Sequence, residues 1–452
     1  MAKYEQFHYK TLDELQSDIA RLGVDVPVTT DLSVLRTPVA IGAGAAPNRI
    51  GISPMEGCDG ELSGAPSDLT RRRYERFGAG GAGLLWFEAM AVVQEGRANP
   101  RQLFIHRGSQ AAVKELRELA LQSAKAAGWP QPYTCVQLTH SGRHSKPGDA
   151  MAPIVAFHHP ALDARVPAVR VITDDEIERL EDQFVEAATI AWECGFDAVD
   201  VKACHNYLLS ELLAGFTREG RYGGSFENRT RALLNVVDKI KAKLGNKLEV
   251  AVRLGVYDQF EHPYAFGADA RDYHKPDYTE PVRLMKILHG KGVKLFGISL
   301  GSPYYNPHLT RPFNQAAYVM PYHPLEGIAL LLDAARRMQA AVPEAVIMDA
   351  GISWLRQYAP NVVAAAIAQG WFKVAGFGRQ AIVWPGFAGE IFKTGALDPR
   401  HTCDGCGFCT TIMRDGGCTG CVVHDKEVYL PIYKKGRAGR PAIRGKEVAE
   451  HL

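Results

Sequence analysis

Eight short apolar segments recur along the chain with helical stretches between them, and this alternation constrains the fold more than any other feature. Several segments are continuously apolar and rich in β-branched residues, as expected for strands that are buried on both faces. The stretches between them, such as DEIERLEDQFVEAATIAWECG, are amphipathic and predict helices. The eight segments are RIGISPM from Arg49, GLLWFEAMAV from Gly83, YTCVQLTH from Tyr133, DAVDVKACH from Asp197, EVAVRLGVYD from Glu249, LFGISLG from Leu295, AVIMDAGI from Ala345 and VAGFGRQ from Val374.

Eight strand–helix units predict an α/β fold of the (β/α)8 TIM barrel type. A doubly wound open sheet could use the same units, but their number favours the barrel. The length of 452 residues is normal for a barrel with additions. We expect a helical N-terminal extension over residues 1–36, the barrel over 37–400, and a cysteine-rich segment with a C-terminal tail over 401–452.

The composition is that of a globular protein, with 46% hydrophobic and 23% charged residues. A formal net charge of +2 gives no reason to expect nucleic acid as a partner. The N-terminus carries acidic residues without the apolar core of a signal peptide, and no apolar run reaches the length of a membrane span. We therefore expect a cytoplasmic protein without a membrane partner. A homo-oligomer is compatible with the sequence, which does not determine the oligomeric state.

In a barrel the active site lies at the carboxyl ends of the strands, and the fourth predicted strand ends in Lys202, His205 and Tyr207. A cationic pair beside a phenol can bind a carbonyl oxygen and deliver a proton. The three side chains can converge only if the strand ends near Ala203 or Cys204, because alternate residues of a strand point to opposite faces. The alternative is that each of these residues, taken alone, only packs against its neighbours.

The seventh and eighth predicted strands end in glycine-containing turns, DAGI and GFGR. Glycines allow backbone N–H groups to approach a phosphate closely, and the guanidinium of Arg379 can bind it through two hydrogen bonds. This pattern indicates a phosphate-bearing cofactor on the barrel axis. The alternative is that Gly376 and Gly378 only permit a tight turn.

Five of the nine cysteines lie in the segment CDGCGFCTTIMRDGGCTGC, which runs from Cys403 to Cys421. Clustered cysteines in a cytoplasmic protein are more often metal ligands than disulfides. Cys403, Cys406 and Cys409 form a CxxCxxC pattern, to which a fourth thiol would add an iron–sulfur cluster. Alternatively, CxxC pairs at both ends of the segment, completed by Cys418 and Cys421, predict a structural zinc site.

The motifs at the strand ends resemble those of the Old Yellow Enzyme family of flavin-dependent ene-reductases. DVKACHNYLLSELL is similar to that family's fourth-strand motif, and REGRYGGSFENRTR is similar to its most specific signature. NRIGISPMEG, GAGLLWFEAMAV, QLTHSGR, VAVRLGV and GFGR follow in the order of the family's flavin-binding segments. The resemblance covers about residues 37–400.

The resemblance implies an FMN cofactor and a set of contacts for it. Gln137 would meet the pyrimidine edge of the flavin, and Arg253 would lie near its N1 side. The family pair that binds the substrate carbonyl corresponds to Lys202 and His205, and Tyr207 corresponds to the proton donor, with Tyr304, Tyr305 and His308 as alternative donors. The implied cofactor-binding residues are Ser53, Pro54, Met55, Glu56, Ala89, Gln137, Arg253, Gly351, Gly378 and Arg379.

The implied reaction is transfer of a hydride from reduced FMN to the β-carbon of a C=C bond conjugated to a carbonyl group, with protonation by Tyr207. The sequence departs from the family pattern at two positions. Lys202 replaces a histidine, and its charge predicts a preference for anionic substrates. Glu56 stands where many members have Thr or Cys beside the flavin, and an ionised carboxylate cannot tune the flavin in the same way.

The subgroup that resembles bacterial 2,4-dienoyl-CoA reductase binds a [4Fe-4S] cluster after the eighth barrel unit. This resemblance implies Cys403, Cys406, Cys409 and Cys421 as ligands. Because no FAD/NAD-binding pattern follows, we expect electrons from a separate carrier protein that docks near the cysteines and the basic tail after Tyr433, with NAD(P)H as the ultimate reductant. Alternative functions are an oxidative flavoprotein dehydrogenase of the same superfamily and a non-redox barrel with structural zinc.

Overall fold

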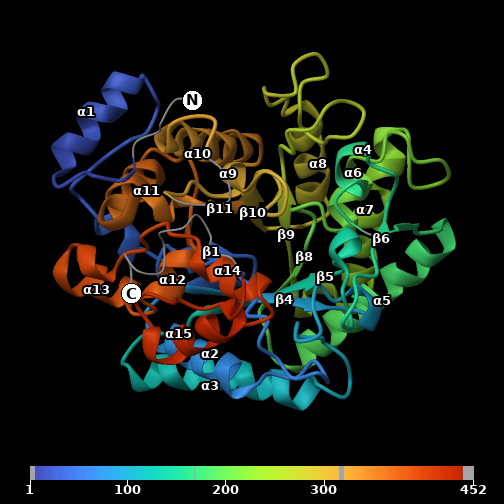
Figure 1. Ribbon diagram of the computed structural model, residues 1–452, viewed down its shortest axis with the longest axis horizontal. Helices are drawn as coiled ribbons and strands as arrows, with labels where there is room; N and C mark the ends of the chain where they lie inside the picture. The colour runs from blue at the N-terminus through green and yellow to red at the C-terminus, as the bar shows by residue number, and fades with distance from the viewer. Residues whose placement is uncertain (1–5, 167, 315–319, 441–452) are drawn as a thin grey trace.

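The computed structural model describes residues 6–166, 168–314 and 320–440. Eight strands form one parallel sheet in the order β11-β10-β9-β8-β5-β4-β3-β12, and a parallel bridge between Met348 and Val374 joins its two ends. Helices surround this sheet (Figure 1), which confirms the predicted (β/α)8 barrel. The barrel strands are β3 (Ile50–Ile52), β4 (Leu84–Ala91), β5 (Tyr133–Thr139), β8 (Ala198–Val201), β9 (Glu249–Gly255), β10 (Leu295–Ser299), β11 (Val346–Met348) and β12 (Ala375–Phe377).

Every predicted apolar segment contains one of these strands, and a principal helix follows each of them along the chain. Among the described residues, no helix is both long enough and apolar enough to cross a membrane. The α-helices are α1 (Leu12–Leu22), α2 (Asp68–Ala79), α3 (Gln110–Ala126), α4 (Pro160–Asp163), α5 (Asp174–Glu193), α6 (Leu208–Leu213), α7 (Phe226–Leu244), α8 (Thr279–Gly290), α9 (Pro307–Thr310), α10 (Pro324–Ala341), α11 (Ala359–Ala368), α12 (Arg379–Val383), α13 (Phe387–Thr394), α14 (Phe408–Arg414) and α15 (Lys426–Arg437). Short 3-10 helices span Ser33–Arg36, Gln94–Gly96, Gly142–His144, Gly245–Lys247, Ile352–Tyr358 and Pro399–His401.

An antiparallel hairpin that the sequence did not predict precedes the barrel. Its strands, β1 (Val39–Ile41) and β2 (Gly44–Ala46), contribute Val39, Ile41 and Ala46 to a buried cluster with residues of the barrel strands such as Trp86 and Cys135. The hairpin therefore helps to close one end of the barrel core. A second small pairing joins β6 (Ile154–Val155) and β7 (Arg170–Val171).

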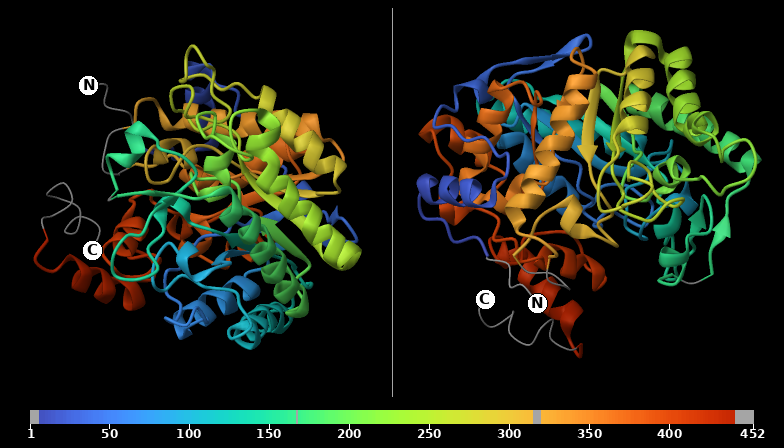
Figure 2. Two further views of the ribbon diagram at one scale, coloured as in Figure 1. Left: turned by 90° about the vertical axis from the view of Figure 1, so that its right-hand side faces the viewer. Right: turned by 90° about the horizontal axis from the view of Figure 1, so that it is seen from above.

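The C-terminal segment with the five cysteines packs against helix α2. Asp425 accepts hydrogen bonds from Arg72 Nη1 at 2.8 Å and from Arg76 Nη1 at 2.6 Å. The backbone N–H of Thr419 donates to the carbonyl oxygen of Gly57 at 2.7 Å. Figure 1 shows α15, in red, beside α2, in blue, and Figure 2 shows this C-terminal part of the chain, in red, at the edge of the molecule. The segment is thus fixed to the loop that joins β3 to α2.

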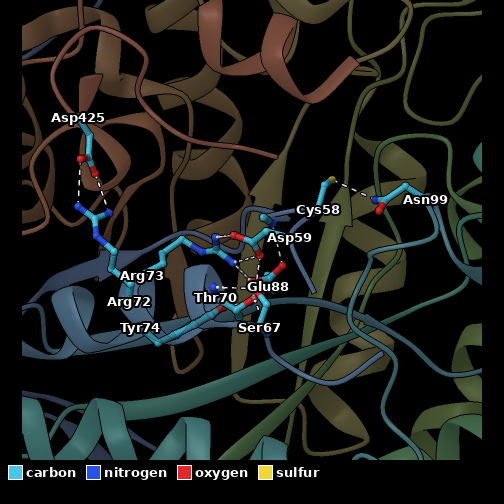
Figure 3. A network of polar contacts seen from close by, with 11 residues as sticks. Cys58, Asp59, Ser67, Thr70, Arg72, Arg73, Tyr74, Glu88, Asn99 and Asp425 are labelled. Carbon is cyan, nitrogen blue, oxygen red and sulfur yellow. Dashed lines mark hydrogen bonds and ion pairs between the residues drawn. The ribbon is translucent and has the colours of Figure 1, made fainter. Parts of the chain in front are cut away.

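A buried ion-pair network supports the same β3–α2 loop (Figure 3). The guanidinium of Arg73 lies between two almost fully buried carboxylates, with Nη2 at 3.0 Å from Asp59 Oδ1 and at 2.5 Å from Glu88 Oε1. Glu88 Oε2 accepts a hydrogen bond from Gly57 N at 2.7 Å. The register between β4 and β5 shifts between Phe87 and Ala89, at the position of Glu88. A bulge of this kind re-aims the side chain that it contains, here toward the loop.

Replacing Arg73 by Met should destabilise the protein by about 3–5 kcal/mol, because it leaves two buried carboxylates without their cation. The matched control is Arg71→Met on the same helix, since Arg71 pairs with Glu115 at the surface, and this change should cost less than about 0.5 kcal/mol. Chemical unfolding of both variants measures the difference. Equal losses for the two substitutions would contradict a supporting role for the network.

Candidate active site

A cavity of about 1090 Å³, including its open mouth, lies at the carboxyl ends of the barrel strands. Its wall combines the β3–α2 loop, the loop after β8, the strand β9, the loops after β10 and β11, and the start of α12 with α14 of the C-terminal segment. Eleven residues predicted for the flavin and substrate sites line this one cavity: Ser53, Pro54, Met55, Glu56, Lys202, His205, Tyr207, Arg253, Gly351, Gly378 and Arg379.

Two of the predicted flavin contacts, Ala89 and Gln137, do not line the cavity. Both are buried within barrel strands. Gln137 Nε2 donates to Asp200 Oδ2 at 2.6 Å, and Asp200 Oδ1 accepts from the backbone N–H of Arg253 at 2.6 Å. Gln137 therefore lies in a hydrogen-bond network that ties three neighbouring strands together behind the cavity wall.

The β3–α2 loop forms one wall with groups that fit a flavin ring. The hydroxyl of Ser53 is buried and has no hydrogen-bond partner among the described residues. A buried hydroxyl without a partner costs free energy, so this group is suited to bind a polar edge of a ligand. Arg253, a residue of β9, donates from Nη1 to the carbonyl oxygen of Pro54 at 3.3 Å. The wall thus offers a hydroxyl and a cation beside the apolar side chain of Met55.

The wall after β11 and β12 provides a close backbone approach and a guanidinium. Gly351 has a φ of 87°, which L-amino acids with side chains rarely adopt. A Cβ atom at Gly378 would lie 3.1 Å from the sulfur of Met55, so a side chain here would crowd the cavity. Arg379 Nη2 donates to Pro312 O at 2.8 Å. These groups fit the phosphate that the sequence pattern predicted.

The loop after β8 brings the three predicted catalytic side chains together. Strand β8 ends at Val201, a single bridge follows at Ala203, and His205 and Asn206 then adopt left-handed φ values of 68° and 56°. Such values are uncommon for residues other than glycine and are found disproportionately at functional sites. The turn allows Lys202, His205 and Tyr207 to line one cavity, as required by the sequence analysis.

Glu56 connects two of these residues. Its Oε1 accepts hydrogen bonds from Lys202 Nζ at 3.3 Å and from the Tyr207 hydroxyl at 3.0 Å. Lys202 Nζ also lies 3.6 Å from the centre of the Tyr207 ring, a favourable cation–π contact. The ammonium group of Lys202 is thus paired with a carboxylate, which weakens the expectation that it attracts anionic substrates.

The hydroxyl of Tyr207 has a second neighbour, the hydroxyl of Tyr304 at 3.0 Å. The ring of Tyr304 stacks on His144 with 3.7 Å between ring centres. The sequence predicted Tyr304 only as an alternative proton donor and Glu56 only as a residue beside the flavin. The sequence contained one signal for the pairing of Glu56 with Lys202: both residues depart from the family pattern, and their charges are opposite.

Burial determines the protonation of the catalytic candidates. It lowers the pKa of His205 well below the ordinary value, and the positive charges of Arg253 and Lys202 lower this pKa further. Burial also raises the pKa of Tyr207 well above its ordinary value, helped by the negative charge of Glu56. The site therefore contains a neutral imidazole, whose Nε2 lies 2.7 Å from Ser299 Oγ, and a neutral phenol that carries a proton.

A second cavity, of about 370 Å³, contains the cysteines. Cys403, Cys406, Cys409 and Cys421 line it together, whereas Cys418 lines a separate cavity with Cys58. Cys409, Arg379 and Ile382 line both the second cavity and the flavin-sized one. In the described part of the chain, no group of three or more His, Cys, Asp or Glu residues has the arrangement of a metal-ion site.

Comparisons with known proteins identify the family of this chain. The family of NADH:flavin oxidoreductases and NADH oxidases matches residues 34–274, more than half of the chain. The chain therefore belongs to this family, and the Old Yellow Enzyme relationship is confirmed.

Individual relatives lie within the same family. An NADH:flavin oxidoreductase of Gibberella zeae is 26% identical over 345 residues, which cover 70% of this chain and 75% of the relative. An NADPH dehydrogenase of a Geobacillus species is 30% identical over 277 residues, 60% of this chain and 74% of the relative. The protein is accordingly a flavin-dependent oxidoreductase.

Solved structures share the fold at lower identity. A 2-naphthoyl-CoA reductase bound to 2-naphthoyl-CoA matches with a TM-score of 0.70 and 20% identity over 91% of this chain, which spans 58% of that longer protein. An Old Yellow Enzyme homologue from Zymomonas mobilis matches with a TM-score of 0.60 and 23% identity over 80% of this chain and 94% of that structure. Both matches support the barrel fold.

Asp349 lies behind the predicted phosphate site, where its carboxylate accepts a hydrogen bond from Gly376 N at 2.7 Å. Burial raises the pKa of Asp349 to about 7, whereas an unfolded aspartate titrates near a pH of about 4. The folded state therefore retains a proton that the unfolded state has lost, so this residue makes the protein less stable as the pH rises through that range.

Asp349→Asn removes this titration while keeping an acceptor for Gly376. We expect the stability of the variant relative to wild type to increase between about pH 5 and about pH 8, because only wild type must take up a proton at this position on folding, and that uptake becomes less favourable as the pH rises. Urea unfolding of both proteins at the two pH values gives the difference in unfolding free energy between variant and wild type, and shows how that difference changes with pH. A difference that does not change with pH would contradict a raised pKa at Asp349.

Proposed function

We propose that the protein is an FMN-dependent ene-reductase that acts on C=C bonds conjugated to a carbonyl group. The observation that supports this reaction best is that Tyr207, Lys202 and His205 line one cavity together with the wall of Ser53, Pro54 and Met55. FMN bound along that wall would supply a hydride. The residues of the chain would bind the alkene, orient it and provide the proton.

For the cofactor, we propose contacts from both walls of the cavity. Ser53, Pro54, Met55 and Glu56 would line the flavin ring, with Arg253 near its N1 side. Gly351, Gly378 and Arg379 would hold the phosphate. Gln137 and Ala89 remain proposed flavin contacts, Gln137 at the pyrimidine edge, although neither lines the cavity.

For the substrate, we propose that Lys202 and His205 bind the carbonyl oxygen and that Tyr207 protonates the α-carbon. A neutral phenol is suited to this task because it carries its proton across the neutral pH range. Its neighbour Tyr304, a residue that is 36% exposed, holds its hydroxyl 3.0 Å from that of Tyr207. Tyr304 could therefore return a proton to Tyr207 after each turnover.

The four cysteines of the second cavity are proposed as ligands of a [4Fe-4S] cluster. All four thiols face one space that adjoins the flavin-sized cavity through Cys409, Arg379 and Ile382. A cluster there would lie close enough to the flavin to pass it single electrons. The zinc alternative needs Cys418 in the ligand set, and that residue lines a different cavity.

For the electron source, we propose a separate carrier protein, with NADH or NADPH as the ultimate reductant. The expected basic docking surface is smaller than the sequence suggested, because Arg437 and Arg440 both pair with Asp415. Lys434 and Lys435 lie on α15, and Arg444, the last basic residue of that prediction, lies outside the described residues. We further propose that the chain divides into an N-terminal extension over residues 1–36, the barrel over 37–400 and the cysteine-rich segment with its tail over 401–452, and that the protein is cytoplasmic.

Tyr207→Phe should slow reduction of an α,β-unsaturated ketone by roughly 10²–10⁴-fold while FMN remains bound, because only the acidic hydroxyl is lost. Tyr304→Phe should slow it less and should increase the solvent isotope effect, since proton return becomes limiting. Tyr305→Phe is the control, because Tyr305 packs on Arg165 and Phe260 away from the pair. Steady-state turnover in light and heavy water measures all three, and near-native turnover of Tyr207→Phe would exclude it as the proton donor.

The metal assignment can be tested with two serine substitutions. Anaerobically purified protein should contain about four irons per chain. Cys409→Ser should lose this iron, whereas Cys418→Ser should keep it. A zinc site of the CxxC…CxxC type would respond in the opposite way, with stoichiometric zinc that is lost in Cys418→Ser and retained in Cys409→Ser. Metal analysis and the visible spectrum of the two variants separate these outcomes.

A further inference from the structure

We propose that Glu56 determines the charge of the substrate that this site accepts. By pairing with Lys202, it makes the substrate side of the cavity neutral and adapts it to uncharged carbonyl compounds rather than carboxylates. The inference concerns ligand binding by the described cavity, and it rests on the proposed function only for the statement that the bound ligand is then reduced.

The geometry brings the two charges together inside the cavity. Lys202 Nζ lies 3.3 Å from Glu56 Oε1, and the exposed fractions of the two side chains are 5% and 14%. The same oxygen accepts the hydroxyl proton of Tyr207 at 3.0 Å. Glu56 thus uses one oxygen to engage both a cation and the proposed proton donor, and all three side chains line the cavity wall.

Burial makes this pairing decisive for ligand charge. An ion pair in a site of low dielectric interacts far more strongly than one in water, and an unpaired buried charge is strongly disfavoured. An anionic ligand must therefore compete with Glu56 for Lys202, and it must also lie near a carboxylate. An uncharged carbonyl oxygen can accept a hydrogen bond from Lys202 while the ion pair remains.

Four arginines also line the cavity, and their effect on the binding of anions must be distinguished from that of Lys202. Arg253 and Arg379 donate to carbonyl oxygens on the walls proposed for the flavin and its phosphate. Arg311 Nη2 lies 3.2 Å from Thr410 Oγ1, and Arg414 donates to Pro303 O at 3.4 Å. Because these residues also line the cavity, a test of Glu56 needs variants in which Lys202 itself is removed.

The test compares three ring ligands of similar shape and different charge: benzoate, benzamide and the ammonium form of benzylamine. Their dissociation constants are measured by equilibrium dialysis against the flavin-loaded protein at neutral pH. Glu56→Gln leaves Lys202 unpaired, so benzoate should gain at least about tenfold in affinity relative to benzamide. Lys202→Met leaves Glu56 unpaired, so the benzylammonium ion should gain by a similar factor relative to benzamide.

Two controls make the result specific. Glu61→Gln removes an exposed carboxylate a few residues further along the same loop, and it should leave both ratios unchanged. Adding Lys202→Met to Glu56→Gln should abolish the gain for benzoate. Flavin content and unfolding temperature show whether each variant keeps the fold.

Unchanged affinity ratios in folded Glu56→Gln and Lys202→Met would overturn the proposal. A gain for benzoate that persists in the double variant would also overturn it, because one of the arginines would then be the anion's partner. The binding test needs no turnover, so it fails independently of the proposed reaction. If the affinity ratios change in the variants but wild type does not reduce alkenes, only the proposed reaction is rejected. If wild type reduces alkenes but the affinity ratios do not change in the variants, only the role of Glu56 is rejected.

Discussion

Ion pairs made by helix α2 hold together the parts of the molecule on which the site depends. Arg73 points into the protein and binds the buried carboxylates of Asp59 and Glu88, which fixes the β3–α2 loop. Arg72 and Arg76, one helical turn apart, bind Asp425 of the C-terminal segment. The wall proposed for the flavin and the segment that carries the cysteines therefore share one anchor, as Figure 3 shows for Arg72 and Arg73.

This anchoring leads to two adjoining cavities with different electrostatic character. The substrate side of the larger cavity contains the Glu56–Lys202 pair and two linked tyrosine hydroxyls. Its opposite end contains Arg379, which suits a phosphate. The cavity of the four cysteines begins where Cys409 faces both spaces. In the proposed function, this order places the electron supply, the cofactor and the proton donor along one path.

Most of the fold could be predicted because each barrel strand is buried on both faces and leaves a short apolar segment in the sequence. The hairpin of β1 and β2 was missed because β2 is Gly-Ala-Ala with two exposed residues and β1 exposes its central residue, so the pair leaves no continuous apolar segment in the sequence. The convergence of Lys202, His205 and Tyr207 depends on left-handed φ values at His205 and Asn206. Because neither residue is glycine, the sequence gives no sign of these values. The pairing of Glu56 with Lys202 joins residues 146 positions apart, so no local pattern could indicate it. The resemblance predicted Gln137 at the flavin, and the hydrogen bond from its amide nitrogen to Asp200, 63 positions away, was likewise beyond any local pattern.

The central claim is that the reduced protein transfers electrons to an activated alkene. A single-turnover experiment tests it most directly: the protein is reduced photochemically without oxygen and then mixed with 2-cyclohexenone, an uncharged α,β-unsaturated ketone. The account predicts that the absorbance of oxidised flavin returns as cyclohexanone forms in proportion to the flavin present. It would be contradicted if the flavin stayed reduced with this and other activated alkenes, while the oxidised protein was readily reduced by amines, as expected for an oxidative dehydrogenase.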